Sequence, residues 1–168
     1  MYSSTVTEWE LVTFNRVKEF ELEALKQAAR EISGFLKVDF CPRIAFVIVS
    51  KRINTRFFQR DVANVPCGTV VDNTVTLVDR YDFLLVSQKA NRGTVSPTSY
   101  NIIEDNTGLS TDEHQQLAYG LTHLYYNWTG NIRLPAPTQY AHKLAYLVGE
   151  SGFQKPPMAH LNCLPYYL

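Results

Sequence analysis

A short basic segment is the first place where this sequence could do chemistry. Lys51, Arg52, Arg56 and Arg60 fall within ten residues, directly after an apolar run at 44–49. In open α/β sheets, ligands bind beyond the carboxyl ends of the strands. Arginine and lysine in that position can hold phosphates through charge-assisted hydrogen bonds. Taken alone, the segment fits a solvated loop as well as a phosphate-binding site.

A second polar segment follows the strand-like sequence YDFLLV. Gln88 and Arg92 have side chains long enough to reach a phosphate or a ribose hydroxyl, and Thr94 supplies a hydroxyl group. Gly93 would let the backbone approach a ligand closely. By itself, however, this composition is also that of an ordinary polar turn.

Aromatic and imidazole side chains form the remaining candidates. Tyr125, Tyr126 and Trp128 cluster near the end of an expected helix, where aromatic residues are more often core residues than base-stacking platforms. His142 lies on a later expected helix, and an isolated histidine there is usually structural or exposed. The local sequence therefore predicts a core role for the aromatic residues and leaves His142 open.

Helices and strands must position these groups. Apolar residues at helical spacing predict an amphipathic helix over 17–35, with Gly34 at its exit. Apolar and β-branched runs predict strands at 44–49, 81–88 and 100–103, the first covered on both faces, and a strand or hairpin at 69–77. This mixture of strands and helices indicates the α/β class, in one domain without a linker.

Two further helices are predicted from their start signals. Ser110 and Glu113 form a capping box that opens a helix expected to run to about Tyr126. Pro135 and Pro137 suit the first turn of the last helix. That helix is expected to end at Gly149 and Gly152.

Composition limits the class of protein. The chain has 168 residues, of which 45% are hydrophobic and 19% charged, as in a globular protein. The formal net charge is zero, so any nucleic-acid binding must use local basic patches. Three cysteines without CxxC spacing favour reduced thiols. With no apolar run of about 18 residues and no signal-peptide pattern, we expect no membrane association and a cytoplasmic or nuclear location.

Four separated blocks carry a resemblance to a known family. They are VSQKANRGTVSPTSY (86–100), THLYYNW (122–128), PAPTQYAHKLAYLVGE (135–150) and the final YYL (166–168). Together they resemble the C-terminal half of a PIWI domain, in the Piwi branch of the Argonaute family. The resemblance covers residues 17–168 and leaves 1–16 as a non-matching N-terminal segment. It implies a partial ribonuclease H-like α/β fold that lacks the first strands of its sheet.

The resemblance also implies RNA contacts. In the family, the segment equivalent to Lys51, Arg52 and Arg56 lies against the nucleic-acid backbone. The loop and helix positions that the family uses for the guide strand correspond here to Gln88, Arg92, Thr94, Tyr125 and Gln139. The Piwi branch usually has glutamine in place of Arg92, a change that keeps phosphate affinity.

His142, in QYAHKLA, matches the histidine of the family's Asp-Glu-Asp-His metal site. Such a site holds two divalent ions that activate water and stabilise the leaving oxygen, and three carboxylates supply most ligands. In this chain WELVTFNRVKEFELEAL replaces the family's glycine-rich, aspartate-bearing turn. Glu10 and Glu19 better fit helical or solvent positions, and Asp82 matches a structural aspartate. One of the four catalytic positions is therefore matched.

The end of the chain resembles the family in another way. Tyr166, Tyr167 and Leu168 match the aromatic-aromatic-leucine ending of the Piwi branch, whose terminal carboxylate helps to hold a divalent ion at the guide 5′-phosphate. His142 and Leu168 are thus the metal candidates. The resemblance implies Mg²⁺, but without tight binding by this chain alone.

Three functions follow as alternatives. The first is a truncated Piwi-like protein that binds a small guide RNA (piRNA) and its target RNA in gene silencing, without autonomous slicer activity. The second is the C-terminal part of an active guide-directed endoribonuclease. The third is a non-catalytic protein-interaction module, and other silencing-pathway proteins are possible partners. The resemblance leaves open whether the chain is an enzyme.

Overall fold

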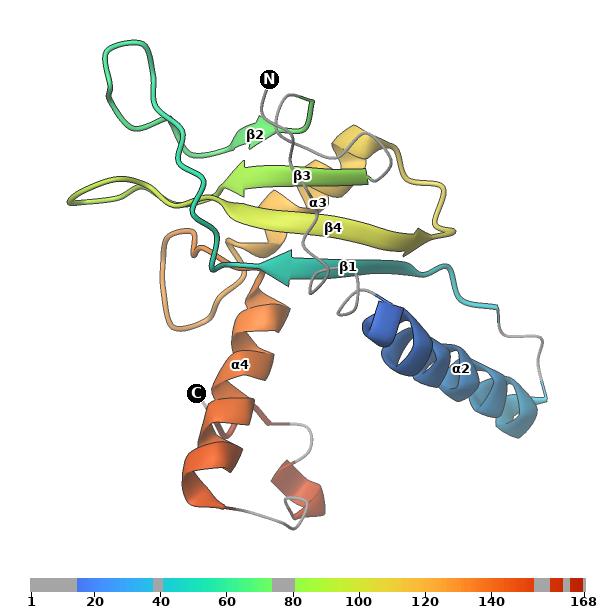
Figure 1. The fold of residues 1–168 in the computed structure, drawn as a ribbon. Helices are drawn as coiled ribbons and strands as arrows, with labels where there is room; N and C mark the ends of the chain where they lie inside the picture. Colours follow the sequence, from blue (N-terminus) through green and yellow to red (C-terminus); the bar gives the residue numbers. More distant parts are fainter. Residues whose placement is uncertain (1–14, 38–40, 74–80, 153–157, 162–163, 168) are drawn as a thin grey trace. The chain divides into compact units, whose positions relative to one another are not determined.

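The computed structural model describes residues 15–37, 41–73, 81–152, 158–161 and 164–167. Its strands form a four-stranded sheet in the order β1-β4-β3-β2, and neighbouring strands run in opposite directions (Figure 1). The strands are β1 (Ala45–Ser50), β2 (Thr69–Val71), β3 (Tyr81–Val86) and β4 (Thr98–Asp105). The helices are η1 (Lys18–Leu22), α2 (Glu23–Leu36), α3 (Thr111–Leu121), α4 (Ala136–Ser151) and η2 (Ala159–Leu161).

The predicted strands exist, with different lengths. β1 and β3 lie where the apolar runs placed them, although β1 is half-buried along its length rather than covered on both faces. β4 starts two residues earlier than predicted and extends to Asp105. Of the strand or hairpin predicted at 69–77, β2 accounts for Thr69–Val71, and residues 74–80 lie outside the described part of the chain.

The helix ends correct the sequence predictions. α3 stops at Leu121 instead of about Tyr126, because the Thr122 N–H and hydroxyl both donate to the Tyr119 carbonyl and close the last turn. α2 continues past Gly34 and ends at Leu36, followed by the C-cap residue Lys37 with a left-handed φ of 52°. α4 passes through Gly149 and ends at Gly152, whose φ of 62° is easily adopted by glycine.

The chain divides into two compact units. The first comprises Met1–Ile48, Val71–Leu84 and Tyr100–Ser110. Phe83 and Tyr100, each 1% exposed, lie on neighbouring strands, and their rings stack with centroids 4.8 Å apart and an interplanar angle of 2°. Because aromatic side chains bury the most apolar area, this pair forms the centre of the unit's core.

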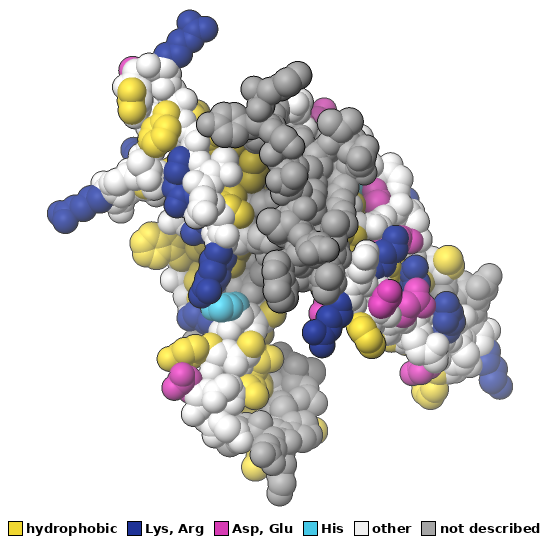
Figure 2. Space-filling model, viewed as in Figure 1, with side chains coloured by type: hydrophobic (Ala, Val, Ile, Leu, Met, Phe, Trp, Pro, Cys, Tyr) yellow, Lys and Arg dark blue, Asp and Glu magenta, His cyan; other side chains and the backbone are white. Residues whose placement is uncertain are grey.

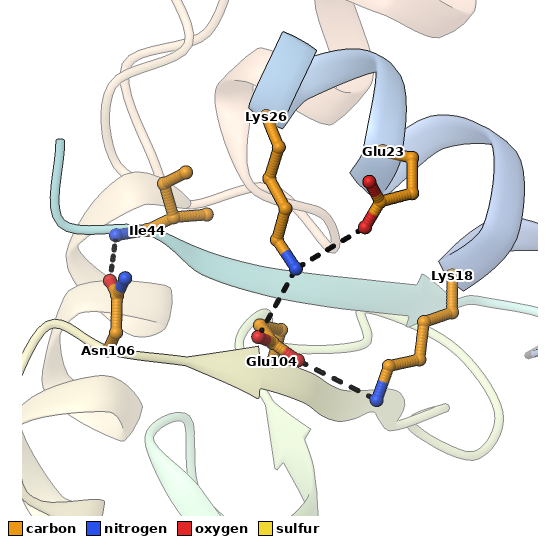
Figure 3. A network of polar contacts seen from close by, with 6 residues as sticks. All are labelled: Lys18, Glu23, Lys26, Ile44, Glu104 and Asn106. Carbon is orange, nitrogen blue, oxygen red and sulfur yellow. Dashed lines mark hydrogen bonds and ion pairs between the residues drawn. The ribbon is translucent and has the colours of Figure 1, made fainter. Parts of the chain in front are cut away.

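Polar contacts in the first unit join its helical part to β4 (Figure 3). Glu104 forms ion pairs with Lys18 at 3.6 Å and with Lys26 at 3.5 Å, and Lys26 also pairs with Glu23. Because these side chains are a third to a half exposed, each pair contributes less than about 1 kcal/mol. The network therefore orients the helix more than it stabilises it.

The second unit comprises Val49–Val70, Leu85–Ser99 and Thr111–Leu168. Its buried apolar side chains come from three stretches far apart in sequence: Leu85, Val86, Val95, Ala118, Leu134 and Ala136. Every described residue that the sequence nominated for RNA or metal binding belongs to this unit. Within the described ranges, no helix combines the length and apolar character needed to cross a membrane.

Candidate nucleic-acid interface

A pocket of about 300 Å³ lies in the second unit. Its lining consists of Lys51, Gln88, Tyr125, Ile132, Arg133, Leu134 and Gln139. Four of these residues are nucleic-acid contacts nominated from sequence, and they come from four separate segments of the chain. The lining carries two cationic groups, two amides and a phenol, and it contains no acidic side chain. An anion with hydroxyl groups would suit this combination.

Lys51 joins the pocket to His142. The Lys51 Nζ lies 3.5 Å from the His142 Nε2, at the point where β1 has ended and α4 is in its second turn. Because an ammonium group only donates, this contact is a hydrogen bond in the tautomer whose Nε2 carries no proton. Figure 2 shows dark blue basic side chains adjoining a cyan histidine on the molecular surface. His142 is thus a neighbour of the cationic pocket.

Arg133 organises the pocket and was not nominated from sequence. Its Nη2 donates to the Lys51 carbonyl, to the Ser96 hydroxyl at 2.8 Å and to the Pro97 carbonyl at 3.1 Å. Burial, and secondarily the charge of Arg56, lowers the pKa of Arg133 below its usual value. The sequence signal that could have identified Arg133 is its position between two apolar residues, Ile132 and Leu134. A charged residue is seldom buried unless it has partners.

The backbone of the same residue is also anchored. The Arg133 carbonyl accepts hydrogen bonds from the hydroxyls of Ser87 and Thr98, both at 3.0 Å. Ser87 and Thr98 are 2% and 0% exposed, so these bonds satisfy polar groups that water cannot reach. Arg133 therefore links the end of β1 and the start of β4 to the segment that precedes α4.

The 88–97 loop brings only part of its predicted contacts to the pocket. Asn64 fixes the loop, because its side-chain amide donates to the Gly93 carbonyl and its Oδ1 accepts the Val95 N–H, both at 2.9 Å. Gly93 has a φ of 71°, the conformation in which glycine is favoured. Gln88 lines the pocket, whereas Arg92 and Thr94 are exposed on the loop outside the lining.

Side-chain exposure alternates along the basic segment after β1. Ile53 and Thr55 are half-buried, whereas Arg52 and Arg56 are exposed and lie outside the pocket lining. The Arg56 guanidinium donates to the carbonyls of Ile53 and Thr55, at 2.9 and 2.7 Å. Arg52 and Arg56 therefore present a solvent-facing positive edge, while Lys51 turns toward the pocket.

The predicted core role of the aromatic cluster is wrong for two of its three members. Tyr126 is 86% exposed and Trp128 is 62% exposed. Tyr125 is half-buried, lines the pocket and lies 5.4 Å from the Tyr140 ring. The helix ends at Leu121, so all three residues lie in the loop that follows it.

The described residues do not fit a divalent metal centre. Nowhere in the described ranges do three His, Cys, Asp or Glu side chains come together. Glu19 lies in η1 and is exposed, and Asp82 lies in β3. Glu10 and Leu168 fall outside the described residues. His142 alone cannot build a Mg²⁺ site, because that ion requires several oxygen ligands.

Comparisons with known proteins agree with the fold. A family model described as Piwi domain matches residues 12–152. The Drosophila melanogaster protein aubergine is 51% identical over 154 residues, which are 91% of this chain and 17% of that protein. A crystal structure of Drosophila Piwi superposes with a TM-score of 0.83 at 42% identity, covering 93% of this chain and 22% of the other.

A more distant structure shares the fold alone. Kluyveromyces polysporus Argonaute with a guide RNA superposes with a TM-score of 0.82 at 23% identity, covering 92% of this chain and 22% of that one. The chain spans less than a fifth of the length of the curated relatives it matches. The predicted partial ribonuclease H-like α/β fold is confirmed. With a family model matching most of its length and relatives near 50% identity, this chain belongs to the Piwi domain family.

Proposed function

We propose that this protein binds the sugar-phosphate backbone of a small guide RNA and its paired target in Piwi-type RNA silencing, without cutting RNA by itself. One observation carries the proposal: Lys51, Arg133, Gln88, Gln139 and Tyr125 converge on one pocket that has no acidic lining residue. The solved Argonaute with a guide RNA supports it at the level of the fold.

The chemistry of the lining suits an RNA backbone. The Lys51 ammonium can donate to a phosphate oxygen, and the exposed edge formed by Arg52 and Arg56 can meet neighbouring phosphates. The amides of Gln88 and Gln139 both donate and accept, as a ribose 2′-hydroxyl requires. Because the whole chain has no net charge, this local concentration of cations must supply the attraction.

Binding of a 5′-phosphorylated single-stranded RNA should weaken steeply as salt rises. Replacing Lys51, Arg52 and Arg56 together by alanine should reduce the slope of log K against log salt by about 2, since each lost contact to a single strand removes about 0.7. Fluorescence anisotropy at several salt concentrations, with and without Mg²⁺, measures both slopes.

Arg30 and Arg43 provide the matched control for that experiment. Both are basic, and neither lines the pocket or belongs to the segment 51–56. Replacing them by alanine should leave the salt slope within about one contact of the unmodified protein. An unmodified chain whose RNA binding does not depend on salt would rule out the proposed phosphate contacts.

The chain by itself should not cleave a target RNA paired to a guide, in the presence of Mg²⁺. Among the described residues, no cluster of carboxylates surrounds His142. Hydrolysis of a phosphodiester by two metal ions requires such a cluster. Gel analysis of a labelled guide-target duplex provides the measurement. Cleavage that disappears in His142→Ala would favour the alternative, an active guide-directed endoribonuclease.

A further inference from the structure

Two large aromatic side chains project from the loop between α3 and α4. Tyr126 is 86% exposed and Trp128 is 62% exposed, although each would gain free energy by burial. Neither residue is needed to fill the core of the second unit, whose buried side chains lie elsewhere. Their exposure leaves both side chains accessible to a ligand that aromatic faces recognise.

Hydrogen bonds hold the loop that carries them. The Ile132 N–H donates to the Thr122 carbonyl at 2.9 Å and closes the base of the loop. The Tyr140 hydroxyl, from α4, accepts the Tyr126 N–H at 2.9 Å and donates to the Leu124 carbonyl at 3.3 Å. Because the backbone is already ordered, a ligand that binds these side chains would not have to order it.

The indole of Trp128 has a defined orientation. A Cβ atom added at Gly130 would lie 3.0 Å from the Trp128 Nε1, and 3.6 and 4.0 Å from Cδ1 and Cε2. The Nε1 side of the indole is therefore the part of the ring system nearest Gly130. Because the side chain is 62% exposed, most of the indole remains accessible to a ligand.

The same loop continues into the proposed RNA pocket. Tyr125, next to Tyr126 in the chain, lines the pocket together with Lys51 and Arg133. The Lys143 Nζ lies 5.7 Å from the centre of the Tyr125 ring and adds positive charge beside it. Proteins that bind single-stranded nucleic acid combine these two elements, a basic groove for the backbone and aromatic faces for the bases.

We propose that Tyr126 and Trp128 form a stacking platform for an unpaired nucleobase of an RNA whose backbone occupies the adjoining pocket. This inference rests on the proposed RNA-binding function and adds a base contact to its backbone contacts. Since every base has a π-face, the platform tolerates any sequence. The continuity of the loop with the cationic pocket favours an RNA base over a protein side chain.

A fluorescence experiment tests the platform in the full chain. Trp9→Phe leaves Trp128 as the sole tryptophan, since the sequence has two. Titration with a 5′-phosphorylated oligouridylate should quench Trp128 emission. In Trp128→Ala, the affinity for this RNA should fall by about tenfold, the low end of the range for a lost base stack, with an unchanged salt slope.

An abasic oligonucleotide separates base contacts from backbone contacts. It has the same phosphates and length but no bases, so Trp128→Ala and the unmodified chain should bind it equally. Tyr146→Ala is the matched control, because Tyr146 is an aromatic residue that is 67% exposed and lies outside the pocket lining. That variant should retain the affinity of the unmodified chain for oligouridylate.

Two different outcomes would contradict the proposed stacking platform, and they distinguish a failure of the base contact from a failure of RNA binding. If oligouridylate binds with the expected salt dependence but Trp128→Ala binds it equally well, the aromatic pair does not stack on a base and fits a protein contact instead. If the unmodified chain shows no salt-dependent binding at all, the proposed RNA-binding function fails, and the platform fails with it.

Discussion

Replacing Arg133 by methionine is expected to lower the free energy of unfolding by about 2–4 kcal/mol, because it leaves part-buried acceptors without their donor. The guanidinium donates hydrogen bonds to the Lys51 and Pro97 carbonyls and to the Ser96 hydroxyl. Methionine has a similar length but no donor. Urea unfolding followed by circular dichroism, with linear extrapolation to water, measures the loss.

Two matched variants sharpen this prediction. Arg133→Lys retains the charge but loses the planar fork, so it should recover only part of the stability. Arg52→Met removes an exposed arginine from the neighbouring basic segment and should change stability by less than about 0.5 kcal/mol. If Arg133→Met were as mild as Arg52→Met, the three hydrogen bonds would not organise the pocket.

Replacing Phe83 by alanine is expected to cost about 3–5 kcal/mol. Phe83 is 1% exposed and its ring stacks on Tyr100 with centroids 4.8 Å apart, so truncation leaves a cavity and removes an aromatic contact. The loss should appear as a lower urea midpoint with little change in slope. A cost below about 1 kcal/mol would mean that the first unit does not depend on this core.

Tyr100→Phe is the conservative counterpart at the same contact. The Tyr100 hydroxyl is buried and has no hydrogen-bond partner among the described residues, and burial raises the pKa of this phenol above its usual range. Because phenylalanine keeps the ring and removes the desolvated hydroxyl, this variant should be neutral or more stable. A clear destabilisation would show that the hydroxyl has a partner in the folded protein.

Local sequence signals predicted most elements because their causes are local. The apolar runs correctly placed β1 and β3, and the proline-initiated helix became α4. The error at α3 has a local cause as well. Its capping box correctly marked the start, but the Thr122 hydroxyl bond to the Tyr119 carbonyl ended the helix five residues before the predicted Tyr126. Tyr126, predicted as the end of that helix, instead lies in the following loop and is 86% exposed.

The sequence by itself determined the family, through four blocks in the right order, and it nominated Lys51, Gln88, Tyr125 and Gln139 as nucleic-acid contacts. Only the tertiary structure decided that these four share one pocket, whereas Arg92 and Thr94 lie outside it. The physical reason is Arg133. Its hydrogen bonds reach backbone and hydroxyl groups 36 to 82 positions away, and no local pattern encodes such partners.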